Sequence, residues 1–187
     1  MVPAMRKLFS TGLAAALLAL VLSAPAMASE ASFYRDVQGR WTGPGQIVAG
    51  KFKGTRFTCD LNGLSPSSKT GLSIGGACRV GMFSQPINAD VERAGRVYVG
   101  KFLDGEAGEG MDVIGGRYTG SKLIVDIRRK DLRGVMVAKL NSTNQLNITI
   151  SVWLDTELIP VIGMTLQRNG DSSNVATTGS IRKQAAR

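Results

Sequence analysis

The chain contains no histidine among its 187 residues, and this absence limits the chemistry that it can perform. Histidine is the usual general base near neutral pH, a frequent zinc ligand and the group that activates serine or cysteine nucleophiles. Catalysis would then have to rest on carboxylate, lysine, serine or tyrosine side chains. We therefore predict that the protein is not an enzyme, and we assign no catalytic residue and no cofactor.

Carboxylates gather in one segment, which runs from Asp104 to Asp112 and reads DGEAGEGMD. A calcium ion takes about six to eight oxygen ligands, and a glycine-rich acidic loop can supply several of them. The spacing differs from that of an EF-hand loop, in which the ligands alternate along twelve or so residues. The sequence therefore favours a solvated hairpin loop here, and no metal site is assigned.

Cations gather in a second segment, where Arg128, Arg129, Lys130 and Arg133 surround a short turn. At the rim of a barrel, such a group is a candidate contact for phosphates or anionic headgroups. The alternative is an ordinary charged hairpin. Nucleic acid is not expected as a partner, because aromatic residues do not interleave with the basic ones as a stacking platform requires.

The two cysteines, Cys59 and Cys78, are predicted to form a disulfide. Cysteines of exported proteins usually pair, and each of these alternates with apolar residues, which places both on the apolar face of a strand. Closing a loop of this length stabilises a chain by roughly 3 kcal/mol. A redox role is not expected, because the C-x-x-C spacing of disulfide oxidoreductases is absent.

The N-terminus has the pattern of a cleaved bacterial secretory signal over residues 1–28: Arg6 and Lys7, an apolar run from Leu13 to Leu22, and a closing Ala26-Met27-Ala28. The apolar run is shorter than the roughly 20 residues that span a bilayer, so no transmembrane span is predicted. Without the leader the formal charge is +7, since the leader holds two of the 23 basic residues and none of the 14 acidic ones. These features predict a periplasmic or secreted protein with a bias toward anionic partners.

Beyond the leader, apolar residues recur at every second position, and no convincing helix is found. The alternation is clearest at Leu146, Ile148, Ile150, Val152 and Leu154, which predicts one dry and one wet face. Glycine and Asn-Gly pairs separate the alternating runs. The predicted strands are 41–49, 55–61, 73–83, 87–92, 96–103, 111–118, 122–129, 133–140, 145–154 and 158–168.

These strands predict an all-β fold, a single antiparallel up-and-down β-barrel of about 8–10 strands, with a β-sandwich as the alternative. The barrel is favoured because closure removes exposed sheet edges and because strand glycines permit tight bends. The predicted organisation is a signal peptide (1–28), an N-terminal lead-in (29–38), the barrel domain (39–170) and a disordered basic tail (171–187).

Gly39-Arg40-Trp41, at the start of the first strand, and Arg168, at the end of the last, resemble the G-x-W motif and the closing arginine of lipocalin-like barrels, the calycins. The resemblance implies that Trp41 and Arg168 are a barrel-closure pair, with the guanidinium lying across the indole. Cation–π attraction of this kind contributes about 0.5–2 kcal/mol. In style the chain also resembles small exported proteins of alphaproteobacteria whose function is unassigned.

Two functions follow as expectations. The favoured one is a structural or interaction role in the cell envelope, with anionic envelope components or another envelope protein as partner, because no polar group is visibly reserved for a ligand. The alternative is a lipocalin-like barrel that binds a small apolar or amphipathic molecule. Barrels of about eight strands are either filled by side chains or hold one ligand, so the sequence leaves both open.

Overall fold

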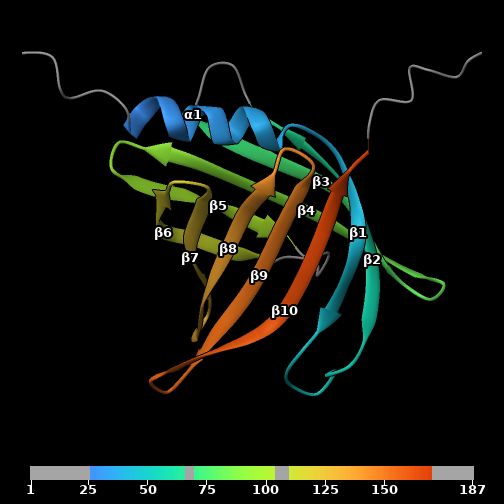
Figure 1. Ribbon diagram of the computed structural model, residues 1–187. Coiled ribbons are helices and arrows are strands. Elements are labelled where there is room, and N and C mark those ends of the chain that lie inside the picture. The colour runs from blue at the N-terminus through green and yellow to red at the C-terminus, as the bar shows by residue number, and fades with distance from the viewer. Residues whose placement is uncertain (1–25, 66–69, 104–109, 170–187) are drawn as a thin grey trace, which may run out of the picture.

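A computed structural model describes residues 26–65, 70–103 and 110–169 as one closed barrel of ten antiparallel strands with a helix across one end (Figure 1). The predicted all-β fold class is therefore confirmed, and the single closed barrel replaces the sandwich alternative. Most of the predicted leader and the tail at 171–187 lie outside the described residues. No described helix is long and apolar enough to cross a membrane.

The elements follow one another with short turns, and every strand pairs with the next one along the chain. The barrel closes where the first strand pairs with the last, with Trp41 opposite Arg168 and Gly45 opposite Met164. This is the predicted up-and-down order. The elements are α1 (Ala26–Val37), β1 (Gly39–Ile47), β2 (Arg56–Leu64), β3 (Gly71–Val80), β4 (Phe83–Ala94), β5 (Val97–Leu103), β6 (Met111–Thr119), β7 (Lys122–Arg129), β8 (Leu132–Ser142), β9 (Gln145–Leu154) and β10 (Glu157–Arg168).

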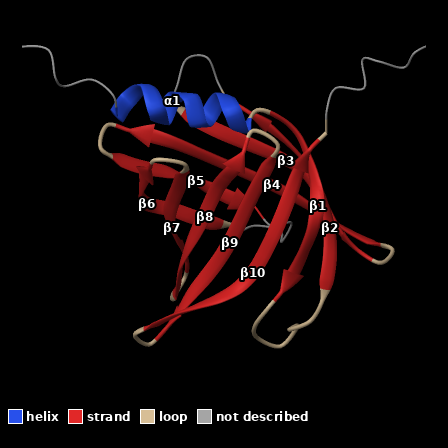
Figure 2. Ribbon diagram, in the orientation of Figure 1, coloured by secondary structure: helices blue, strands red, loops and turns tan. Residues whose placement is uncertain are grey.

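Helix α1 lies across the end of the barrel at which β1 begins and β10 ends (Figure 2). Phe33, Tyr34 and Val37 are each at most 2% exposed and join the barrel core. Burying each of these side chains contributes about 1.5–3 kcal/mol, and this burial holds the helix in place. The expectation that no helix follows the leader was wrong, because a 12-residue helix begins at Ala26 and includes most of the lead-in.

Several predicted strand boundaries were also wrong. The run 73–83 is not one strand, because a turn at Gly81 and Met82 separates β3 from β4 and Gly81 adopts a φ of 57°. Pro86 lies inside β4 instead of before it, opposite Ala77. The pairs between β4 and β5 begin only at Asn88. Among the described residues, Pro86 therefore pairs with β3 alone, where its missing N–H costs no ladder hydrogen bond.

The second strand likewise continues through Asn62-Gly63, which the sequence predicted as its end. Gly63 is needed there for a different reason. A Cβ atom at this position would lie 2.3 Å from the carbonyl oxygen of Val37, the last residue of α1. The glycine thus allows the helix to pack closely on β2, instead of ending the strand.

Side chains that point into the barrel alternate with outward ones, as the period of two predicts. The largest fully buried side chains lie toward the α1 end of the barrel, among them Trp41, Tyr34, Leu146 and Leu166. At the opposite end, β3 and β4 extend past β5 as a projecting hairpin (Figure 1). Side chains thus fill the interior beneath the helix. The half of the interior away from α1 is either filled by other groups or open.

Candidate ligand-binding cavity

The half of the barrel away from α1 encloses a cavity of about 390 Å³. Its walls include the last inward positions of the strands at that end, Ile47, Val80 and Arg129, and deeper residues such as Leu61 and Leu123. It therefore runs from the middle of the barrel to the open end. The remaining lining residues are Phe57, Leu72, Ile74, Cys78, Gln85, Ile87, Ala89, Val91, Phe102, Met111, Leu132, Met136, Ala138, Ile148, Ile150, Val152, Val161, Ile162 and Met164.

Small inward residues create this space. Ala89 on β4 and Ala138 on β8 both line the cavity and are 6% and 5% exposed. Each occupies an inward position at which a larger aliphatic side chain would fill part of the barrel. A cavity with these walls is suited to an apolar molecule, because apolar cavities bind water poorly and hydrocarbon well. Its volume lies within the roughly 300–1,000 Å³ range of small-molecule sites.

Polar groups are confined to the cavity mouth. Among the described lining residues, Gln85 and Arg129 alone carry polar side chains outside the disulfide. Gln85 is the third residue of β4, and Arg129 is the last residue of β7, so both lie at the end away from α1. The arrangement provides an apolar interior with one amide and one guanidinium group at the mouth, which matches a molecule with an apolar body and a polar head.

The opposite end is closed by a buried polar cluster beneath α1. Glu30 on the helix is 4% exposed and accepts hydrogen bonds from the hydroxyl groups of Tyr34 and Tyr98. Its other oxygen lies 2.5 Å from Nη1 of Arg93, near the end of β4. Burial raises the pKa of both tyrosines above the usual value, and the neighbouring Glu30 carboxylate adds to the effect. This cluster ties the helix to β4 and β5.

The predicted closure residues, Trp41 and Arg168, lie in contact at the same end. The Arg168 guanidinium carbon is 4.3 Å from the centre of a Trp41 ring. The guanidinium also donates to the carbonyl oxygens of Asp36, Gln38 and Thr143. The Trp41 indole N–H donates to the Val37 carbonyl at 2.9 Å. The two residues thus bind the end of α1 as well as each other.

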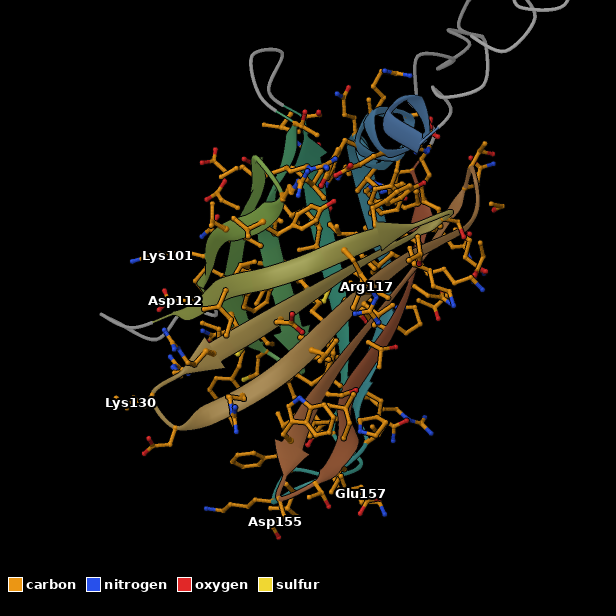
Figure 3. All side chains as sticks on the ribbon, turned by 90° about the vertical axis from the view of Figure 1, so that its left-hand side faces the viewer. Lys101, Asp112, Arg117, Lys130, Asp155 and Glu157 are labelled. Carbon is orange, nitrogen blue, oxygen red and sulfur yellow. A yellow bond between two sulfur atoms is a disulfide. The ribbon has the colours of Figure 1, made fainter. Side chains whose placement is uncertain are left out.

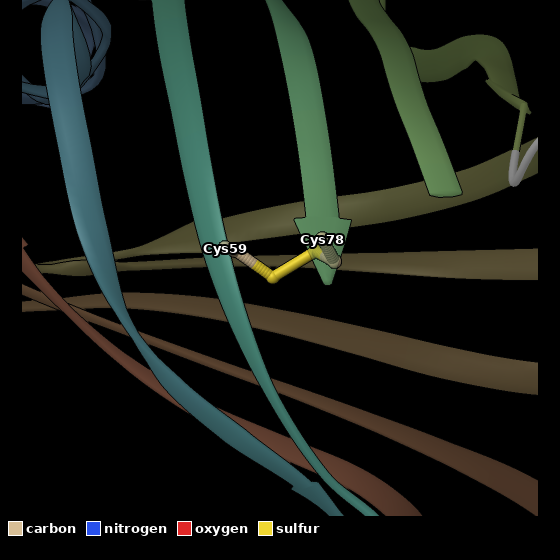
Figure 4. The surroundings of a disulfide bond; sticks show 2 residues. All are labelled: Cys59 and Cys78. Atoms are coloured by element: carbon tan, nitrogen blue, oxygen red, sulfur yellow. A yellow bond between two sulfur atoms is a disulfide. The ribbon is translucent and has the colours of Figure 1, made fainter. Parts of the chain in front are cut away.

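Cys59 and Cys78 form a disulfide between β2 and β3, where they are directly opposite each other (Figure 4). Cys59 is fully buried, and Cys78 lines the cavity. The bond therefore fixes one wall of the cavity near the projecting hairpin. It does so on the apolar face, as the alternation of the sequence predicts.

The four cations of the predicted anion-contact patch surround the β7–β8 turn but face different ways. Arg128 and Arg133 are opposite each other on β7 and β8, and both are exposed. Arg129 lines the cavity mouth, on the other face of β7. Lys130 occupies the turn with a φ of 52°, at the end of the barrel away from α1 (Figure 3). The structure thus divides the group between the outer surface and the mouth.

One site that the sequence suggested lies largely outside the described residues, and one polar cluster was not predicted from the sequence. The acidic stretch at 104–109 is outside the described residues, and Asp112 is exposed on β6, opposite Arg128. The Glu30 cluster was missed because α1 was not expected. Its signal was present in the sequence, since Glu30, Phe33, Tyr34 and Val37 have the spacing of one helical face.

No protein-family model matches the chain, and no curated protein matches it. Among solved structures, the chain is similar to the crystal structure of Rv2717c from M. tuberculosis, with 9% sequence identity and a TM-score of 0.55. That match covers 75% of this chain and 98% of the other. The structure of EF1p2_mFAP2b bound to DFHBI is matched at 12% identity and a TM-score of 0.40, over 75% of this chain and 100% of the other. The first similarity shows a shared barrel fold alone, and the second is too distant to support an argument.

Proposed function

We propose that the protein binds one small apolar or amphipathic molecule inside the barrel. The observation that carries this proposal is the cavity of about 390 Å³ with almost entirely apolar walls. The sequence favoured an interaction role with a filled interior, and the hollow half of the barrel favours the ligand-binding alternative. Burial of apolar surface would supply the affinity, at about 25 cal/mol per Å² before the cost of association.

The ligand would place its apolar part among residues such as Phe57, Ile148 and Met164, with its head at the mouth. Arg129 would attract an anionic head, and Gln85 would accept or donate a hydrogen bond. The closed, ten-strand antiparallel barrel is compatible with a calycin-like carrier, although the resemblance at Trp41 and Arg168 involves the closed end and not the binding site.

We also infer that the protein is exported. The leader pattern of residues 1–28 and the Cys59–Cys78 bond support this inference, because disulfides persist mainly in oxidising compartments such as the periplasm. An envelope location would bring the barrel to apolar and amphipathic molecules of the membrane. Contact with anionic envelope components remains part of the same proposal.

Titration with the uncharged fluorescent probe N-phenyl-1-naphthylamine tests the binding site. We expect saturable binding of one probe per protein, and at least tenfold weaker binding in Ala138→Phe, whose new ring would occupy the cavity. Val137→Phe is the matched control, because Val137 adjoins Ala138 on β8 but is absent from the cavity walls. Melting temperatures of both variants verify that each is folded.

Equal loss of probe binding in the two variants, or no saturable binding by the wild type, would contradict the proposal. Native mass spectrometry of the full chain, expressed with its leader and purified without detergent, provides a second measurement. A retained small molecule that is lost in Ala138→Phe supports the cavity as its site. A bare mass together with negative probe titrations favours the interaction role.

A further inference from the structure

Large apolar side chains are unusually exposed on two neighbouring hairpins at the open end of the barrel. Phe52, in the β1–β2 loop, is 62% exposed; Met82 and Phe83, at the β3–β4 turn, are 92% and 78% exposed. Burial of such side chains contributes about 1.5–3 kcal/mol each, so their exposure favours a partner. We call residues 48–56 and 79–85 the apolar lip.

The two hairpins of the lip are adjacent because β2 pairs with β3, from Thr58 opposite Arg79 onward. The β1–β2 loop lies at the end of the barrel opposite α1, and the β3–β4 hairpin projects beyond the wall beside β2 (Figure 1). The apolar groups therefore occupy the tips of separate turns and do not form one continuous face. A protein partner would require a packed apolar core at the interface, which separate tips do not form. A fluid lipid layer, in contrast, can accept each side chain independently.

The charges of the lip are all positive. Lys51 and Lys53 flank Phe52, and the Lys51 ammonium lies 5.6 Å from the centre of its ring. Arg56 and Arg79 are exposed beside them. The residues 48–56 and 79–85 contain no aspartate or glutamate. Carboxylates at the same end of the barrel, such as Asp155 and Glu157, belong to a different hairpin (Figure 3).

We propose that the apolar lip docks on the surface of an anionic lipid bilayer. Apolar and aromatic tips would enter the boundary between headgroups and acyl chains, and the flanking cations would contact the headgroups, which is the balance found in interfacial membrane segments. Lysine suits this arrangement because its aliphatic stem can lie in the apolar layer while its ammonium remains among the headgroups. The mouth of the cavity opens at the same end of the barrel. Docking requires no ligand, so it does not depend on the cavity, but it rests on the proposed contact with anionic envelope components.

Flotation of the full chain with phosphatidylcholine vesicles, with and without 30% or so phosphatidylglycerol, tests this proposal. We expect binding to the anionic vesicles only, with a fall in affinity in 0.5 M or so salt as the headgroup charge is screened. Phe52→Ser/Met82→Ser removes one tip from each hairpin and should weaken binding about tenfold or more. Lys51→Ser/Lys53→Ser should weaken binding roughly fivefold for each cation removed.

Leu64→Ser/Val97→Ser is the matched control, because these residues are 59% and 53% exposed but lie at the α1 end. Its vesicle binding should equal that of the wild type. Absence of wild-type binding to anionic vesicles, or an equal loss in the control, would overturn the proposal. If Phe52→Ser/Met82→Ser binds the anionic vesicles as well as the wild type, the attraction is one of charge alone, and docking through the apolar lip is overturned. Probe binding without vesicles is measured on every variant, so that failure of the cavity and failure of docking are told apart.

Discussion

The guanidinium of Arg168, at the end of β10, lies over the ring of Trp41, at the start of β1, with its central carbon 4.3 Å from the ring centre. Because these two strands close the barrel, the contact joins the first and last strands of the fold. The same guanidinium reaches the backbone carbonyls of Asp36 and Gln38, just where α1 ends. One side chain therefore links barrel closure to the placement of the helix.

Arg168→Ala should lower the free energy of unfolding by roughly 2–4 kcal/mol, because a cation–π contact and several charge-assisted hydrogen bonds are lost together. Arg168→Lys should recover little of this loss, since an ammonium cannot reproduce the planar fork. Urea unfolding followed by tryptophan fluorescence measures the change. Arg117→Ala, on the exposed face of β6, is the control and should leave the urea midpoint nearly unchanged. Equal midpoints for Arg168→Ala and the wild type would contradict this account.

The Glu30 cluster predicts a loss of stability in alkaline solution. A tyrosine in an unfolded chain titrates near pH 10, and burial raises the pKa of Tyr34 and Tyr98 above that value. The contribution of the two neutral hydroxyl groups to the free energy of unfolding is therefore complete below about pH 10. It is lost as the pH rises from there toward the folded-state pKa. Tyr98→Phe should cost about 1.5–3 kcal/mol at pH 7, because a hydrogen bond to a buried carboxylate is removed.

Urea midpoints measured between pH 7 and pH 11 or so would separate these two effects. We expect a steeper decline above about pH 10 in the wild type than in Tyr98→Phe, because the variant lacks one of the two ionising hydroxyls. Tyr118→Phe, outside the cluster, provides the comparison for loss of a tyrosine hydroxyl elsewhere. A wild-type midpoint that does not change over this pH range would show that the cluster does not couple to folding.

The disulfide should stabilise the barrel by constraining the unfolded chain. The two cysteines are 19 residues apart in sequence, and the chain-entropy estimate for such a loop is about 3 kcal/mol. Cys59→Ser/Cys78→Ser should lower the free energy of unfolding by roughly that amount. Addition of dithiothreitol should lower the melting temperature of the wild type and leave that of the double variant unchanged. A wild-type melting temperature insensitive to reduction would argue against a structural role.

Gly100 on β5 should tolerate no side chain. A Cβ atom there would lie 1.9 Å from the Asp90 carbonyl oxygen, and its φ of 155° disfavours other residues. Gly100→Ala should therefore cost about 1–3 kcal/mol or more through overpacking. Gly163→Ala on β10 is the matched control, because nothing lies within 4 Å of the added atom. Thermal melts of the two variants should differ by several degrees, and coincident melts would show that the backbone can shift to relieve the contact.

The sequence was sufficient to predict the barrel because period-two patterning and turn residues are local signals. In β7 and β9, the predicted strand limits coincide with the observed ones. The β3–β4 turn was missed because Val80 and Phe83 continue the apolar run across Gly81 and Met82. Helix α1 was missed because its apolar face is short and follows directly on the predicted leader.

The cavity could not be predicted, because the same inward alternation occurs in a filled barrel and in a hollow one. Whether space remains depends on how residues such as Ala89 and Ala138 meet those of distant strands, which alternation does not specify. The position of Arg129 is a second feature that the sequence could not specify. The sequence groups it with Arg128 and Lys130, yet the pleat of β7 directs it to the mouth and Arg128 to the outer surface.

The placement of α1 has a consequence for how the proposed ligand would move. In the part of the chain that the structure describes, the helix and the buried Glu30 cluster close one end of the barrel. A ligand bound in the cavity would therefore enter and leave at the opposite end. Because uptake and release would follow the same path, any net direction of transfer would depend on what that end of the barrel faces.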